Sequence, residues 1–194
     1  MRALFISESK LEERRKNLAD RLRSCMPEAP FFMADFQQQG MYKKVIGIHG
    51  GQSRGLPYRN WRVSLSKHQV SLAYYEVWEL RKEKSRGITY LLEKAYLHLY
   101  LPYPSGGEKD LIFVQCDPQE SEDSTHYRFK IAPHAHFEIA GDPWKNAHVP
   151  LCDGWQDEVL ENISALDKAL TRAMEFLVEQ IYPITSKIDL RTYL

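Results

Sequence analysis

Two features are missing from this chain, an imbalance of charge and a long apolar run. Lysine plus arginine number 26 and aspartate plus glutamate number 26, so the formal net charge of the 194 residues is zero. The overall charge therefore does not indicate a strongly cationic nucleic-acid binder, although a local basic patch is compatible with it. No apolar run approaches the roughly 18 residues that cross a bilayer. We expect no membrane-spanning segment.

Cysteines are few, and no targeting signal is recognisable. The three cysteines, Cys25, Cys116 and Cys152, are odd in number and lack C-x-x-C spacing. Neither a disulfide framework nor a thiolate zinc site is therefore indicated. Near the start, the only apolar run covers residues 3–6 and is followed at once by charges. This run is too short for the core of a signal peptide, and we expect a cytoplasmic protein.

The length and composition are those of one ordinary globular domain. A chain of 194 residues with 43% apolar and 27% charged residues can bury a single core. No internal repeat or linker divides it. We predict a single domain over residues 1–194, with an N-terminal helix at about 9–26, a β-rich middle at about 43–151 and a C-terminal helix at about 157–181.

The expected N-terminal helix has an apolar stripe and a charged face. Ser9 and Glu12 have capping-box spacing, and Pro27 ends the segment. The apolar stripe consists of Leu11, Leu18, Leu22 and Cys25. The basic residues of the other face are Arg14, Arg15, Lys16, Arg21 and Arg23. Because acidic residues are interleaved with them, we expect a solvated face in preference to a nucleic-acid contact.

The expected C-terminal helix has the most regular pattern in the chain. Apolar residues recur at three- and four-residue steps: Val159, Ile163, Leu166, Leu170, Ala173, Leu177 and Ile181. Asp157 and Glu158 suit the first turn, and Pro183 stops the helix. The stripe packs on the protein's own sheet or forms the seam of a homodimer, and we favour internal packing.

Strand-like segments fill the middle of the chain. They cover residues 43–48, 61–66, 70–80, 88–101, 111–116 and 126–139. Short spacers rich in glycine, proline and serine favour antiparallel neighbours. The segment 70–80 fits the strand and helix periods about equally. Together these elements predict an α+β fold, a mainly antiparallel β-sheet with an N-terminal helix and a long C-terminal helix packed on one face.

One strand-like segment carries an unusual row of polar residues. From residue 127 onward the odd positions are compatible with a core, and the even positions include Arg128, Lys130, His134, His136 and Glu138. Strand side chains alternate between faces, so the even positions would share one face. Pro133 lacks an N–H group and indicates an edge strand or a bulge.

Three histidines in this region can make a chemical site. His134 and His136 lie roughly 6 to 7 Å apart at Cα on a strand, and His148 returns to them if the chain turns at 141–143. Together with Glu138 they would bind a transition metal ion such as zinc or manganese. Without metal, one histidine would act as a catalytic base and another as an acid, while Arg128 and Lys130 bind an anionic substrate. A solvated strand face without function is the third interpretation.

His98 is a weaker candidate. In "AYLHLYL" it shares strand parity with Tyr96 and Tyr100. It could reach the three histidines only if its strand neighbours theirs. We expect instead a histidine packed on a tyrosine-rich face.

The pattern "CDP", "YRFKIAPHAHFEIA" and "AHVPL" between Cys116 and Leu151 resembles an uncharacterised family of bacterial proteins. This resemblance does not imply any particular reaction. The segments "APHAHFE" and "AHV" also resemble small histidine-rich bacterial toxins, a likeness that implies cleavage of RNA.

Two functions follow as hypotheses. The first is a hydrolase of phosphodiester or nucleotide substrates, in a defence or toxin setting, with nucleic acid or a nucleotide as its partner. In the second, the protein is a non-enzymatic binding or regulatory protein. Its histidine cluster then holds a structural metal or contacts a partner, and its C-terminal helix dimerises.

Overall fold

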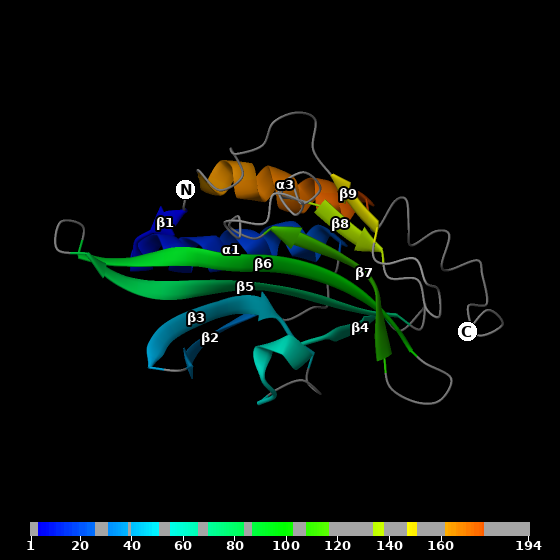
Figure 1. The fold of residues 1–194 in the computed structure, drawn as a ribbon, viewed down its shortest axis with the longest axis horizontal. Helices are drawn as coiled ribbons and strands as arrows, with labels where there is room; N and C mark the ends of the chain where they lie inside the picture. Colours follow the sequence, from blue (N-terminus) through cyan, green and yellow to red (C-terminus); the bar gives the residue numbers. More distant parts are fainter. Residues whose placement is uncertain are drawn as a thin grey trace.

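The computed structural model describes residues 4–25, 31–38, 40–50, 55–65, 70–83, 87–102, 108–116, 134–137, 147–150 and 162–176. Its strands form one sheet (Figure 1) with the order β2-β3-β5-β6-β7-β8-β9, while β1 pairs with β6 and β4 pairs with β5. The strands are β1 (Phe5–Ile6), β2 (Phe31–Gln38), β3 (Met41–Ile48), β4 (Val63–Leu65), β5 (Val70–Glu83), β6 (Gly87–Pro102), β7 (Glu108–Cys116), β8 (His134–Phe137) and β9 (Ala147–Pro150). Every pairing is antiparallel, as predicted.

The strands largely follow the predicted segments, with two differences. The ambiguous segment 70–80 is a strand, because β5 is hydrogen-bonded to β3 on one side and to β6 on the other. Among its described residues, 61–65, the segment 61–66 contributes the three residues of β4, since a 3₁₀ turn, η2 (Tyr58–Asn60), and an extended Trp61 precede it. The short β1, the whole of β2 and β9 were not among the predicted strand segments.

The N-terminal helix, α1 (Glu8–Cys25), lies within one residue of its predicted bounds. Its start is stabilised by Ser7 and not by Ser9. The Ser7 carbonyl accepts the first helical bond from Leu11 N, and the Ser7 hydroxyl accepts from Lys10 N at 3.4 Å. The apolar stripe is buried at Leu11, Leu18 and Leu22, and the side chain of Cys25 lies outside the described residues.

The C-terminal helix, α3 (Ile163–Glu175), begins later than predicted. Asn162 has an extended backbone, and its side chain accepts a hydrogen bond from Ala165 N at 2.9 Å, so the helix starts after this cap and not at 157. Residues 157–161 and 177–181 lie outside the described residues. In the part of the chain that the structure describes, neither helix is long and apolar enough to cross a membrane.

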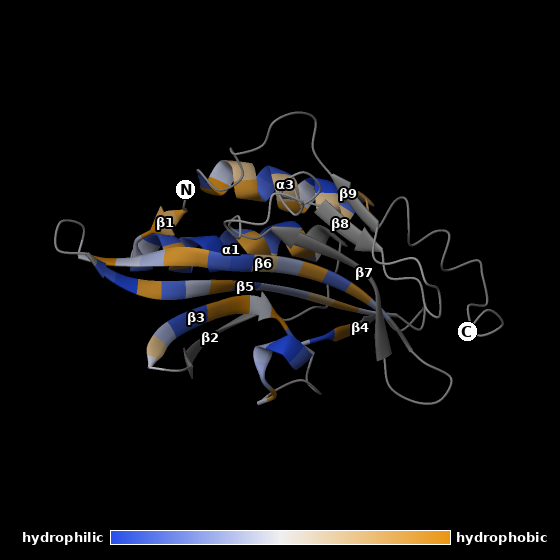
Figure 2. Cartoon of the chain, in the orientation of Figure 1, coloured by the Kyte–Doolittle hydropathy of each residue, from blue (hydrophilic) through white to orange (hydrophobic). Residues whose placement is uncertain are grey.

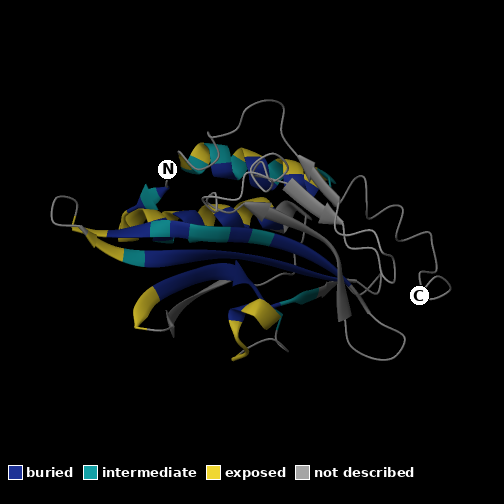
Figure 3. Cartoon of the chain, viewed as in Figure 1, coloured by how far each residue is buried: buried dark blue, intermediate teal, exposed yellow. Residues whose placement is uncertain are grey.

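The two helices cover one face of the sheet (Figures 1 and 3), so the protein has a main core between helices and sheet. Leu166, Leu170 and Ala173 of α3 belong to this core, together with sheet residues such as Leu97 and Leu99. Over these residues the stripe of α3 therefore packs within the chain, as the internal alternative requires. Figure 2 shows the hydrophobic positions alternating with hydrophilic ones along α3 and the long strands.

A charged group lies at the centre of this core, which corrects the expectation for α1. Arg14 was expected on a solvated face, yet it is buried, because it follows Leu11 by three residues and precedes Leu18 by four. Its Nε and Nη2 atoms donate to the two oxygens of Glu76 at 2.7 and 2.6 Å, and Nη1 donates to Asp167 Oδ1 at 2.7 Å. One guanidinium thus links α1, β5 and α3.

Both carboxylate oxygens of Glu76 accept hydrogen bonds in this network. The side chain is 0% exposed, and it also accepts from Trp78 Nε1 at 2.9 Å and from the Tyr74 hydroxyl. Burial alone would lower the pKa of Arg14, but the ion pair with Glu76 raises it above its usual value. We therefore assign Glu76 a structural role in joining the helices to the sheet.

Candidate functional site

The backbone brings the predicted histidines to adjoining strands at one edge of the sheet. β8 contains His134 and His136, and β9 contains His148. In the β8–β9 register, His136 lies directly opposite His148, and His134 lies opposite Pro150. Directly opposed residues of an antiparallel pair have Cα atoms about 4.5 to 5.5 Å apart. The predicted return of the chain to His148 is therefore present as the pairing of β8 with β9, while the predicted turn at 141–143 lies outside the described residues.

The same register continues inward to a fourth histidine. His136 pairs with Phe113 of β7, and Phe113 pairs with His98 of β6. β7 thus separates β6 from β8, so His98 does not neighbour the histidine pair as the sequence left open. Two strand spacings put its Cα about 10 Å from that of His136. We call the residues His98, Phe113, His136 and His148 the histidine row.

The histidine row belongs to the sheet face opposite the helices. His98 contacts Tyr75 and Tyr96, and Tyr75 is part of a second cluster of buried residues that also includes Tyr58 and Trp61. Opposed residues on neighbouring strands share a face of the sheet. The register therefore assigns His136 and His148 to the face of His98, which we call the aromatic face.

Rings stack along β6 on this face. His98 is stacked between Tyr75, at 5.7 Å between ring centroids, and Tyr100, at 5.5 Å, with interplanar angles of 18° and 11°. All three residues are buried. Burial, and then the neighbouring phenols of Tyr100 and Tyr96, raise the pKa of Tyr75 well above its usual value. The expectation of a histidine packed among tyrosines is confirmed for His98.

Cations lie over the tyrosines of the aromatic face. The guanidinium carbon of Arg62 is 4.0 Å from the Tyr100 ring centroid, Lys94 Nζ is 5.7 Å from that of Tyr96, and the guanidinium carbon of Arg59 is 5.9 Å from that of Tyr58. A hydrogen bond with the Tyr58 phenol raises the pKa of Arg59. These distances are within the range of cation–π attraction. We call Arg59, Arg62 and Lys94 the cation strip.

Trp61 anchors the loop that carries two of these cations. A methyl group on Gly47 would meet the backbone oxygen of Tyr74 at 2.7 Å and the Trp61 ring at 2.9 Å, so only glycine allows this close approach. Trp61 Nε1 donates to the Leu56 carbonyl at 2.9 Å, and its ring contacts His49 at 5.3 Å between centroids. Arg59 and Arg62 are thereby positioned over the sheet.

Several predicted site residues lie outside the described part of the chain. These are Arg128, Lys130 and Glu138, the expected anion-binding pair and the expected carboxylate ligand. For the histidines of β8 and β9 the structure gives the backbone register, and their catalytic or metal-binding roles stay predictions. Among the side chains that the structure describes, no three histidine, cysteine, aspartate or glutamate residues gather as a metal site.

The sequence interpretation missed the cation strip. Arg59, Arg62 and Lys94 are scattered among turn and strand residues, and no spacing rule relates them. The only local signal was the alternation of Lys94, Tyr96, His98 and Tyr100, which places four polar or aromatic residues on one strand face. Comparison of the chain with protein-family models, curated proteins and solved structures gives no match.

Proposed function

We propose that the protein is a hydrolase of phosphodiester bonds in a nucleic acid or nucleotide, with His136 and His148 as its central residues. The observation that carries this proposal is the β8–β9 register, which sets the two histidines opposite each other. Imidazole side chains that start from Cα atoms about 5 Å apart can both reach one phosphate group. His134, two residues along β8, would lie beside them on the same face.

Two imidazoles can perform the hydrolysis without any further group. One neutral histidine removes a proton from the attacking water or hydroxyl as its oxygen bonds to phosphorus. The other histidine, protonated, gives its proton to the leaving oxygen as the old P–O bond breaks. Because unperturbed imidazoles titrate near pH 6.5, both forms coexist around neutral pH. The rate should therefore show a bell-shaped dependence on pH.

The same histidines, together with Glu138, are suited to bind zinc or manganese. A bound metal ion would lower the pKa of a coordinated water and polarise the phosphate. In either version the substrate is anionic. The cation strip on the same face supports this substrate class, since Arg62 lies over the ring of Tyr100, and Tyr100 is two positions along β6 from His98.

The proposal is tested by hydrolysis of bis(p-nitrophenyl) phosphate, short RNA and nucleotides, with and without added Zn²⁺ or Mn²⁺. We expect His136→Ala and His148→Ala each to lower the rate by about 10² or more. The matched control is His68→Ala, a histidine outside the histidine row to which the proposal gives no role. It should keep its rate, provided that all variants retain the wild-type urea midpoint.

Elemental analysis of the same purified protein decides between the metal-bound and metal-free versions. A stoichiometric transition metal that is lost in His136→Ala would assign the ligand role. Retention of the rate in both histidine variants would contradict the proposal. So would a tightly held metal with no turnover of any substrate, a result that favours the binding or regulatory alternative.

A further inference from the structure

A second row of residues lies beside the histidine row on the aromatic face. It begins at Tyr96, which precedes His98 by two positions on β6 and contacts it at 5.5 Å between ring centroids. The register then sets Gln115 of β7 opposite Tyr96, and His134 of β8 opposite Gln115. On β9 the row ends at Pro150. Because opposed residues share a face, Gln115 belongs to the aromatic face.

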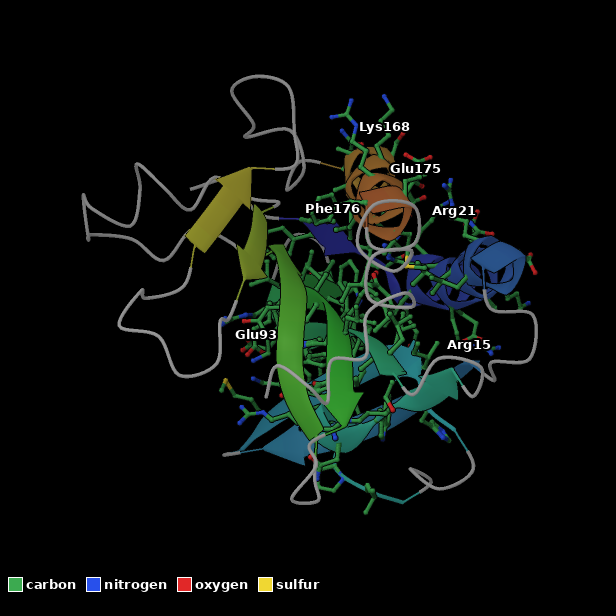
Figure 4. All side chains as sticks on the ribbon, turned by 90° about the vertical axis from the view of Figure 1, so that its right-hand side faces the viewer. Arg15, Arg21, Glu93, Lys168, Glu175 and Phe176 are labelled. Carbon is green, nitrogen blue, oxygen red and sulfur yellow. The ribbon has the colours of Figure 1, made fainter. Side chains whose placement is uncertain are left out.

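This row is on the side of the sheet away from the helices. Lys94 Nζ lies 5.7 Å from the centroid of the Tyr96 ring and 3.7 Å from the carboxylate of Glu93. Figure 4 shows Glu93 on the sheet, away from Lys168 and Glu175 of α3, and it shows β8 and β9 side by side next to β7. The helices α1 and α3 therefore cover the other face, and neither lies over this row.

Across β7, β8 and β9 the polar positions of the two rows form a diagonal band. The band consists of Gln115, His134, His136 and His148, and the two positions beside it hold Phe113 and Pro150. Opposed residues have Cβ atoms about 4.5 to 5.5 Å apart, and diagonal neighbours about 7 to 8 Å. Gln115 is opposed to His134 and diagonal to His136. One amide is thus placed at the end of a band of three imidazoles.

Hydrolysis of a phosphodiester needs a group of this kind. As the new P–O bond forms, negative charge has to be stabilised on the non-bridging oxygens of the phosphate. The two histidines that move protons cannot also serve as fixed donors to these oxygens. A glutamine amide has two N–H donors that do not titrate. Its side chain is long enough to bridge a diagonal separation to a phosphate held at His136.

We propose that Gln115 donates a hydrogen bond to a non-bridging oxygen of the scissile phosphate. This inference rests on the proposed function and deepens it by adding a catalytic residue. Gln115 transfers no proton, since the proton removed from the attacking oxygen and the proton given to the leaving oxygen both pass through histidines. Its hydrogen bond strengthens as charge develops on the oxygen, so it contributes to kcat more than to substrate binding.

The first test is the variant Gln115→Leu, which keeps a side chain of similar size but cannot donate. Loss of one such donor should lower kcat by about 10² or more, with a smaller change in KM. The matched control is Gln37→Leu, a strand glutamine opposite Tyr42 on β3, at the far end of the sheet order. It should keep the wild-type kcat. Both variants are compared at their measured urea midpoints, so that a loss of fold is distinguished from a loss of catalysis.

A phosphorothioate substrate separates a direct hydrogen bond from a merely structural role. In a dinucleotide, sulfur replaces one or the other non-bridging oxygen, giving two stereoisomers. Sulfur is a weak acceptor, so the wild type should hydrolyse one isomer more slowly than the normal substrate. In Gln115→Leu this difference between isomers should disappear. A structural role for Gln115 would instead lower the rates of all three substrates by the same factor.

The contact with phosphate is also measured without turnover, by NMR of the ¹⁵N-labelled protein. The side-chain amide signal of Gln115 is the one that Gln115→Leu lacks. Added inorganic phosphate should shift this signal with the same half-saturation as the ring signals of His136, which are identified by their loss in His136→Ala.

The inference and the proposed function fail separately. If His136→Ala abolishes hydrolysis while Gln115→Leu keeps kcat and the difference between isomers, the hydrolase stands and the role of Gln115 is wrong. An amide signal that phosphate does not shift would likewise overturn the inference. If phosphate shifts the Gln115 signal but no substrate is hydrolysed, the phosphate contact stands and the hydrolase is wrong.

Discussion

Arg14 and Glu76 form a bidentate ion pair in which neither side chain is more than 1% exposed. The pair joins the first helix to a central strand across 62 positions of sequence. Its carboxylate also accepts from Tyr74 and Trp78, and its guanidinium also donates to Asp167 of α3. Removal of Arg14 would leave the Glu76 carboxylate buried without a counter-ion, whereas removal of Glu76 would leave Arg14 with Asp167 as its remaining ion-pair partner.

We expect Arg14→Met to lower the free energy of unfolding by about 3 to 5 kcal/mol, because Glu76 would then be a buried carboxylate without its counter-ion. Urea denaturation measures this loss. The adjacent Arg15 is a matched control, since it pairs with Glu12 at the surface. Arg15→Met should cost less than about 1 kcal/mol. Similar losses for the two variants would contradict a central role for the buried pair.

The helical period of α1 sets Arg14 on the same side as Leu11 and Leu18. Because its side chain is charged, we nevertheless expected it on the solvated face of the helix. The deciding information was the partner Glu76, which lies in another element and has no sequence relationship to Arg14. Local patterns such as the stripe of Leu11, Leu18 and Leu22 were sufficient for the helix itself. Long-range ion pairs depend on the sheet register, which no local pattern contains.

In the candidate site, too, local sequence patterns predicted some features, while others depended on tertiary structure. The parity of His134 and His136 and the return to His148 could be predicted from strand alternation and a turn. The position of β7 between His98 and His136 could not, because strand order depends on which edges pair during folding. The positions of Arg59 and Arg62 in the cation strip could not be predicted from the sequence either, since they depend on Trp61 packing against Gly47.

Gly47→Ala should destabilise the protein by about 1 to 3 kcal/mol, as overpacking does in other cores. The added methyl group would lie 2.7 Å from the Tyr74 backbone oxygen, which the sheet holds in place. Gly50→Ala is a milder comparison, because its nearest atom would be the Arg62 oxygen at 3.1 Å. Chemical denaturation of both variants ranks them, and an equal or larger loss for Gly50→Ala would contradict the packing described for Trp61.

Alkaline pH should unfold the protein through its buried phenols. The pKa of Tyr75 is raised in the folded state, chiefly by burial. Its contribution to stability is therefore complete below the unfolded pKa of about 10 and is lost as the pH rises above that value. We expect the stability of Tyr75→Phe to fall less steeply above pH 10 than that of the wild type. Parallel pH profiles from urea denaturation would show that Tyr75 titrates normally.

The most direct test of the central claim is a disulfide trap across β8 and β9. In a background of Cys25→Ser, Cys116→Ser and Cys152→Ser, the pair His136→Cys/His148→Cys would occupy directly opposed positions. Their Cα separation of about 5 Å lies within the range for a disulfide.

The diagonal pair His134→Cys/His148→Cys, at roughly 7 to 8 Å, is the control. After mild oxidation, mass spectrometry of proteolytic peptides should find the 136–148 disulfide in nearly all molecules and little of the 134–148 disulfide. Failure of the 136–148 pair to cross-link, or a preference for the diagonal pair, would show that His136 and His148 do not face each other and would contradict the proposed site.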